Sequence, residues 1–117
     1  MKGWSEKEFT KAVLNEATRF GWSLSYHPLP ATVAKGKIIT PYQGNGKGFP
    51  DLILLKSTCG IVAELKVGNN KPTSEQQKWL EAFRALGFIA EVWYPRDWDR
   101  IVSLLSGGRA SSLAVRI

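Results

Sequence analysis

Besides Lys56, which ends the first of them, two strongly apolar stretches of the sequence contain three ionisable residues. Asp51 opens the stretch 51–56, and Glu64 and Lys66 lie within the stretch 61–67. Both stretches have the length and composition of buried β-strands. Charged groups in a buried sheet are unfavourable unless they are paired or bind a metal ion. These three residues are therefore the first candidates for chemistry.

The spacing of the charges allows them to share one face of a hairpin. Glu64 and Lys66 are two residues apart, so on a strand they leave the same face, about 6.6 Å apart along the backbone. An antiparallel register that pairs Asp51 with Glu64 or with Lys66 gathers all three charges, whereas pairing with Leu65 separates them. The turn 57–60 permits either arrangement, and the sequence does not choose between them.

Two gathered carboxylates beside a lysine would suit a hard divalent cation. Mg²⁺ and Mn²⁺ prefer carboxylate, carbonyl and water oxygens. Such a cation lowers the pKa of water and neutralises charge that develops on a phosphate, and the lysine adds a positive donor. A gathered cluster therefore suits phosphodiester hydrolysis.

Each residue also has a simpler explanation. Asp51 follows Pro50 and could be a turn residue that opens a strand. Glu64 and Lys66 could form a solvated pair on an edge strand. Each explanation is adequate for one residue, but the apolar residues around both strands favour a catalytic role for the three together.

Two capping boxes predict where helices begin. Ser5 and Glu8 have the required spacing, and apolar residues then recur at helical period over residues 6–20. Thr73 and Gln76 repeat this spacing before a second apolar stripe. The sequence therefore predicts a helix on either side of the apolar hairpin.

Strands complete the predicted fold. We expect strands over residues 22–27, 51–56, 61–67 and 88–94. The last directly follows a helix and should lie parallel to 61–67 through a crossover, before a final helix over 97–106. The order helix, strand, strand, strand, helix, strand, helix predicts an α/β fold: a mixed sheet flanked by helices.

A long basic loop is expected over residues 28–48, where lysines lie among glycines and prolines without sustained periodicity. Candidate phosphate contacts are its lysines, a lysine before the second helix, and the histidine at the end of the preceding strand. These residues are His27, Lys35, Lys37, Lys47 and Lys71.

Composition narrows the class of protein. The 117 residues predict one domain, 1–117, and the net charge of +6 favours a polyanionic partner, with nucleic acid the leading candidate. One cysteine cannot form an internal disulfide, and one histidine leaves a zinc finger without its ligands, so a metal would be held mostly by oxygen. No apolar run approaches the roughly 20 residues of a membrane span. We expect a cytoplasmic protein without membrane contact.

The segment GFPDLILL, followed by AELK, resembles the PD-(D/E)XK nuclease superfamily, and specifically its VRR-NUC branch. Pro50 and Asp51 match the PD, and Glu64, Leu65 and Lys66 match the ExK. The resemblance extends over residues 8–105 through KEF, GW followed by YH, SEQQKWL, and VWYP followed by DWD. This ordered set is far more specific than PD and ExK alone.

The resemblance implies a restriction-endonuclease-like core and roles for individual residues. It implies that Asp51, Glu64 and the backbone carbonyl of Leu65 bind Mg²⁺ or Mn²⁺, with Lys66 assisting the attacking water. Glu8 matches the acidic position of the first helix and Gln76 the glutamine of the second, although a capping box explains both. The chain departs from the family's usual pattern at two peripheral positions, Thr10 and Ser74.

Relatives without extra domains resemble junction-resolving nucleases, often phage-borne and dimeric. We therefore expect a metal-dependent, structure-specific DNA endonuclease that acts as a homodimer on branched DNA such as four-way junctions. Two alternatives remain open. One is a restriction-type or nicking nuclease on duplex or single-stranded DNA, and the other is an inactive DNA-binding module of the same fold.

Overall fold

The structure of the chain, a computed structural model, describes residues 3–22, 24–26, 32–34, 37–39 and 47–107. Its two longer helices, α1 (Glu6–Arg19) and α2 (Ser74–Ala85), both begin at the predicted capping boxes. At α1, the Ser5 hydroxyl accepts the Glu8 backbone N–H, and the Glu8 carboxylate accepts the Ser5 N–H. These reciprocal bonds satisfy donors that the first helical turn leaves unpaired. None of the helices in the described part of the chain has the length and apolar character needed to cross a bilayer.

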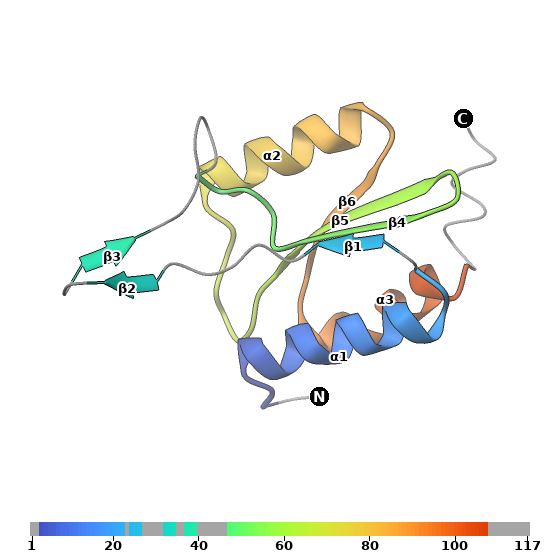
Figure 1. Cartoon of the computed structure of the whole chain (residues 1–117), viewed down its shortest axis with the longest axis horizontal. Coiled ribbons are helices and arrows are strands. Elements are labelled where there is room, and N and C mark those ends of the chain that lie inside the picture. Colours follow the sequence, from blue (N-terminus) through green and yellow to red (C-terminus); the bar gives the residue numbers. More distant parts are fainter. Residues whose placement is uncertain (1–2, 23, 27–31, 35–36, 40–46, 108–117) are drawn as a thin grey trace.

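A four-stranded mixed sheet forms the centre of the fold (Figure 1). Its strand order is β1–β4–β5–β6, with antiparallel pairing except between β5 and β6, which are parallel. This confirms the predicted α/β class and the predicted parallel return. The strands are β1 (Leu24–Tyr26), β4 (Leu52–Lys56), β5 (Cys59–Leu65) and β6 (Ile89–Trp93).

Helices cover both faces of this sheet, with α1 and α3 (Trp98–Leu105) on one side and α2 on the other (Figure 1). Successive residues of β5 point to alternate faces. Ile61 and Leu65 belong to the apolar core under α1 and α3, whereas Val62 packs in the smaller core with Leu80 of α2. The same alternation places Glu64 on the α2 side of the sheet.

The segment expected to be one long loop also contains strands. β2 (Thr32–Ala34) and β3 (Lys37–Ile39) pair antiparallel as a separate two-stranded sheet, so the prediction of a loop was wrong here. Each strand has three residues, too few for a period of two to stand out. Their β-branched residues, which favour extended backbone, are the signal that was overlooked.

Two smaller boundaries also differ from the prediction. The hairpin turn between β4 and β5 comprises only Ser57 and Thr58, so Cys59 lies within β5 rather than in the turn. The last helix is preceded by the 3₁₀ turn η1 (Pro95–Asp97). Asp97 accepts a hydrogen bond from the Tyr94 N–H at 2.9 Å and does not cap α3 with its side chain.

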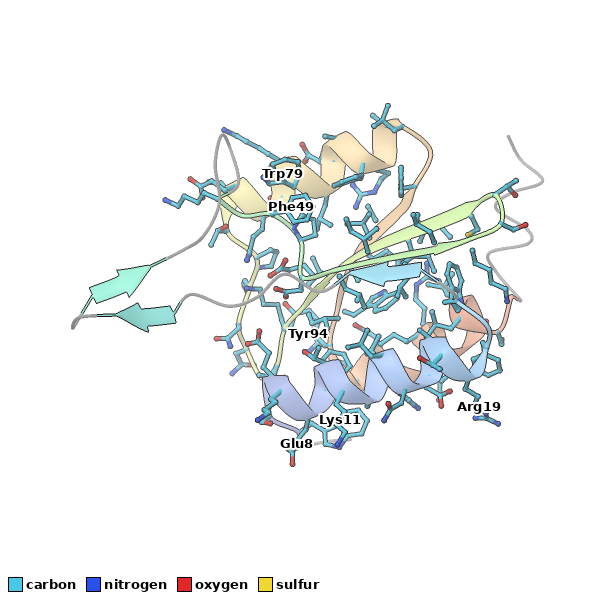
Figure 2. The ribbon with its side chains drawn as sticks, viewed as in Figure 1. Glu8, Lys11, Arg19, Phe49, Trp79 and Tyr94 are labelled. Atoms are coloured by element: carbon cyan, nitrogen blue, oxygen red, sulfur yellow. The ribbon has the colours of Figure 1, made fainter. Side chains whose placement is uncertain are left out.

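Gly48 brings the segment before β4 into close contact with the start of α2. Its φ is +82°, and an added Cβ would lie 2.6 Å from Cβ of Glu75 and 2.8 Å from the backbone nitrogen of Gln76. The Trp79 indole N–H donates to the Lys47 carbonyl at 3.1 Å, and the Phe49 ring lies edge-on to Trp79 (Figure 2). These contacts fix the residues that lead into Asp51.

We expect Gly48→Ala to lower the free energy of unfolding by about 2 kcal/mol or more, because the left-handed backbone and the contact with α2 both oppose a side chain. Gly87→Ala is the matched control, since its φ is +98° but nothing lies within 4 Å of an added Cβ. Urea unfolding measures both variants. If the two variants lose the same free energy of unfolding, the close contact between Gly48 and α2 adds nothing to the cost of the side chain.

Candidate active site

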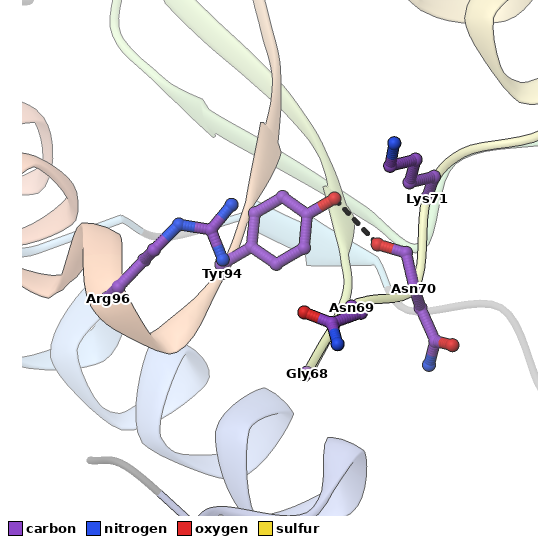
Figure 3. Close-up of a pocket in the computed structure, with 6 residues that line it drawn as sticks. All are labelled: Gly68, Asn69, Asn70, Lys71, Tyr94 and Arg96. Atoms are coloured by element: carbon purple, nitrogen blue, oxygen red, sulfur yellow. Dashed lines mark hydrogen bonds between the residues drawn. The ribbon is translucent and has the colours of Figure 1, made fainter.

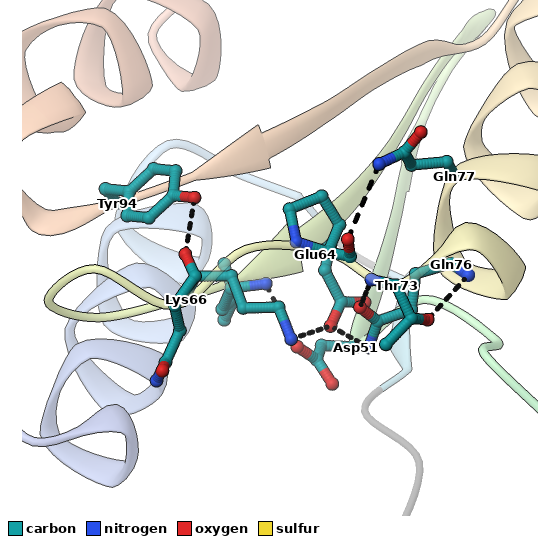
Figure 4. A network of polar contacts seen from close by, with 10 residues as sticks. Asp51, Glu64, Lys66, Thr73, Gln76, Gln77 and Tyr94 are labelled. Atoms are coloured by element: carbon teal, nitrogen blue, oxygen red, sulfur yellow. Dashed lines mark hydrogen bonds and ion pairs between the residues drawn. The ribbon is translucent and has the colours of Figure 1, made fainter.

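The register between β4 and β5 brings the two predicted carboxylates together. Leu52 pairs with Ala63, so continuing the ladder by one residue places Asp51 opposite Glu64. This is one of the registers that gathers the three charges. Asp51 Oδ2 accepts the Leu65 backbone N–H at 3.0 Å, and Lys66 Nζ lies 3.4 Å from Glu64 Oε2 (Figure 4).

Glu64 is the only charged or polar residue that is buried in the described part of the chain, with 1% of its surface exposed. Its Oε2 accepts a hydrogen bond of 2.7 Å from Gln76 Nε2. Its Oε1 has no hydrogen-bond partner, and no other buried side-chain nitrogen or oxygen of the described residues shares this condition. In the ionised carboxylate this oxygen would be a buried acceptor without a donor, which is unfavourable, so the ionised form needs a further partner there.

Burial, followed by the negative charge of Asp51 and a hydrogen bond between the two side chains, raises the pKa of Glu64 to about 8. Lys66 offsets part of this effect by favouring the ionised carboxylate. Without a further positive charge, Glu64 therefore retains its proton at neutral pH. Strongly shifted pKa values of this kind concentrate at functional sites.

Gln76 links the start of α2 to this carboxyl group. Its Oε1 accepts the Thr73 backbone N–H at 2.8 Å, as a capping box requires. Because the amide oxygen is engaged in this way, the amide nitrogen faces Glu64 and donates to it. The capping role and the site role of Gln76 therefore coexist in one side chain.

The donor set at this place suits a hard divalent cation. Asp51 and Glu64 offer carboxylate oxygens, and Glu64 Oε1 is a buried acceptor without a donor. Mg²⁺ and Mn²⁺ are bound by such oxygens and keep several waters. Within the described residues no three His, Cys, Asp or Glu side chains come together, so a carbonyl such as that of Leu65 would have to supply the third protein oxygen.

The Glu8 side chain is engaged at the start of α1. It is exposed, completes the capping box with Ser5 and makes no hydrogen bond with Asp51 or Glu64. The structure therefore confirms the capping role of Glu8, which the sequence offered as an alternative to a catalytic one. A catalytic role for Glu8 is therefore left as a prediction from family resemblance.

The predicted phosphate contacts are only partly described. Lys47 is exposed before β4, and Lys71 is exposed on the loop that follows β5. Lys37 begins β3, where it pairs with Ala34. His27 and Lys35 lie outside the described residues.

Sequence reasoning missed a pocket at the ends of two neighbouring strands. It is lined by Gly68, Asn69, Asn70, Lys71, Tyr94 and Arg96 (Figure 3). Only Lys71 had been selected as a candidate. The available signal was the predicted parallel pairing, because parallel strands end at the same edge of a sheet and bring the segments that follow them together.

Comparisons with known proteins agree with this architecture. A solved structure named "VRR_NUC domain protein" superposes with a TM-score of 0.63 at 23% identity, covering 96% of this chain and 92% of that chain. That similarity shows a restriction-endonuclease-like fold. No curated protein matches the sequence significantly. The sequence model of the VRR-NUC domain matches residues 6–97, a span that contains Asp51, Glu64 and Lys66. The chain therefore belongs to the VRR-NUC domain family of DNA nucleases.

Proposed function

We propose that the chain is a Mg²⁺- or Mn²⁺-dependent endonuclease that hydrolyses phosphodiester bonds in branched DNA such as four-way junctions. Family membership supports a nuclease that acts on DNA. The observation that carries the metal dependence is Glu64, a buried carboxyl group beside Asp51 with one oxygen that lacks a donor. A divalent cation would satisfy that oxygen and favour the ionised carboxylate.

Asp51, Glu64 and the Leu65 carbonyl are the residues proposed to hold the cation. When bound, the cation would neutralise charge on the scissile phosphate and lower the pKa of the attacking water. Asp51 is itself oriented by the Leu65 N–H, and Glu64 by Gln76. Such outer contacts fix the direction of metal-binding carboxylates.

Lys66 supplies a positive charge at the same place. Its ammonium group lies 3.4 Å from Glu64 Oε2, and its backbone N–H donates to the Trp93 carbonyl of β6 at 2.9 Å. The side chain is largely enclosed, which strengthens its electrostatic effect on a nearby anion. We assign Lys66 to position the attacking water and stabilise the developing negative charge.

The preference for branched DNA is the finer part of the proposal. The chain is basic and small, which favours recognition of backbone shape over long base sequences. Two copies on a twofold axis would place two sites for paired nicks in a symmetric junction. We therefore propose a homodimer on its substrate.

One cleavage experiment separates these ideas. Purified protein is incubated with a labelled four-way junction, a flap, plain duplex and single strand, with Mg²⁺, Mn²⁺ or EDTA. We expect cation-dependent cuts that move with the branch point, and light scattering should detect two copies per junction. Sequence-dependent fragments of plain duplex would instead indicate a restriction-type enzyme, and binding without cuts an inactive binding module.

Gln76→Ala should lower cleavage about 10- to 100-fold, the usual effect of losing a partner that orients a metal-binding side chain. Gln77→Ala is the matched control, because the Gln77 side chain is exposed and donates only to the Pro72 carbonyl, at 3.4 Å. Because Gln76 also caps α2, the melting temperature of each variant is measured to show whether a lower cleavage rate comes from a less stable fold. If both variants cleave equally, the bond from Gln76 to Glu64 has no part in the reaction.

A further inference from the structure

The pocket at the ends of β5 and β6 is basic and lies close to the candidate active site. Its volume is about 330 Å³, and it opens to solvent, since five of its six lining residues are exposed. Of its six lining residues, Lys71 and Arg96 are cationic and none is acidic. Figure 3 shows these two side chains on either side of the Tyr94 ring. A basic pocket that opens to solvent can admit a phosphate group of a DNA backbone.

Contacts within the pocket hold its shape. The Tyr94 hydroxyl donates to the Asn70 carbonyl at 2.7 Å, which ties the loop after β5 to the segment after β6. The Arg96 guanidinium lies over the Tyr94 ring, 3.9 Å from its centroid. Stacking on an aromatic ring restricts the arginine while leaving its N–H edge available, an arrangement suited to phosphate oxygens.

The two cations are not paired with acids in the described part of the chain. Neither Lys71 nor Arg96 forms an ion pair or a side-chain hydrogen bond with another described residue. By contrast, Arg100 of α3 pairs with Glu91 of β6. Lys71 and Arg96 therefore remain able to neutralise an external anion.

Chain geometry places the pocket beside the proposed cleavage site. Gly68 follows Glu64 by four residues, so their Cα atoms are at most about 14 Å apart. A DNA strand rises about 3.4 Å per nucleotide along the duplex axis, so this reach covers about four nucleotides. The pocket could therefore contact the same strand that the candidate active site would cut.

We propose that Lys71, Tyr94 and Arg96 form a subsite for a backbone phosphate of the substrate DNA, within about four nucleotides of the bond that is cut. This assignment rests on the proposed function, because it takes the cleaved strand as the ligand. Arg96 is the principal contact, held by Tyr94, and Lys71 is the second. The subsite would fix the strand so that the scissile phosphate reaches Asp51 and Glu64.

Two double variants with the same loss of charge test the subsite. K71A/R96A removes both pocket cations, and K11A/R19A removes two exposed cations of α1 (Figure 2). Binding of the full chain to a labelled junction is measured by anisotropy in EDTA over a range of salt concentrations. We expect K71A/R96A to bind about tenfold more weakly than K11A/R19A, with a shallower salt dependence by about one to two counterions. Among single variants, R96K should bind the junction more weakly than the wild type but more tightly than R96A.

Replacing single phosphates of the DNA by uncharged analogues shows which phosphate the pocket contacts. Single methylphosphonates are introduced at successive positions of the cut strand, and one of them, within about four nucleotides of the cut, should weaken wild-type binding but not that of K71A/R96A. Equal weakening by the two double variants, or no position with this pattern, would overturn the subsite. Cleavage is scored separately, so a chain that binds through the pocket but never cuts would contradict the proposed function and not the subsite.

Discussion

Asp51→Asn is expected to lower the rate of DNA cleavage by at least about 10³-fold while leaving DNA binding intact. The substitution keeps the size of the side chain and its capacity to accept the Leu65 N–H, but it removes the negative charge that would hold the cation. A 10³-fold lower rate corresponds to the loss of about 4 kcal/mol of transition-state stabilisation, which the bound cation would otherwise supply. Single-turnover cleavage and anisotropy measure the two properties separately.

Asp99→Asn is the matched control for this experiment, since Asp99 is exposed in the first turn of α3. It makes the same chemical change without touching the carboxylate pair, so cleavage should stay within about twofold of the wild type, as for most surface substitutions. Binding by Asp51→Asn should be unchanged or tighter, because one negative charge near the phosphate is gone. If Asp51→Asn cleaves as well as Asp99→Asn, Asp51 takes no part in catalysis.

Glu64→Gln should remove one contribution to the pH dependence of stability in the metal-free protein. The folded-state pKa of Glu64 is raised from the usual 4.5 to about 8. Between these values the folded carboxyl group holds a proton that the unfolded chain has released. The folded state then binds more protons, so stability falls as pH rises. Between pH 6 and pH 8 the wild type should lose about 2 kcal/mol through this group.

Urea unfolding in EDTA at pH 6, 7 and 8 measures this effect, and the difference between variants isolates it from other titrating groups. Glu81→Gln, an exposed change on α2, should retain the wild-type dependence, whereas Glu64→Gln should show a smaller one. Mn²⁺ should reverse the trend in the wild type, because a cation favours the ionised carboxylate. Identical pH profiles for all three proteins would contradict the raised pKa.

Local sequence signals predicted the helices correctly because capping is a local interaction. The pairs Ser5 with Glu8 and Thr73 with Gln76 each lie three residues apart, and each forms the expected reciprocal bonds. The register of the hairpin was not predictable in the same way. A two-residue turn, with Ser57 at φ 55°, pairs Lys56 with Cys59 and thereby places Asp51 opposite Glu64.

The finer features of the site depend on contacts between distant residues. The hydrogen bond from Gln76 to Glu64 and the unpartnered Glu64 oxygen follow from how α2 lies on the sheet. The pocket forms because Asn70 and Tyr94, 24 residues apart, meet at one sheet edge. Residue type identified the candidate charges, but only packing shows which of them face one another.

Binding of Mn²⁺ is the most direct test of the claim that Asp51 and Glu64 share a cation. Titration calorimetry of the full chain, with electron paramagnetic resonance of free Mn²⁺, counts the sites and measures their affinity at pH 6 and pH 8. We predict binding that tightens with pH, releases protons, is lost in Asp51→Asn and Glu64→Gln, and persists in Asp99→Asn. Equal binding by wild type and Asp51→Asn, or no binding by wild type at pH 8, would contradict the account.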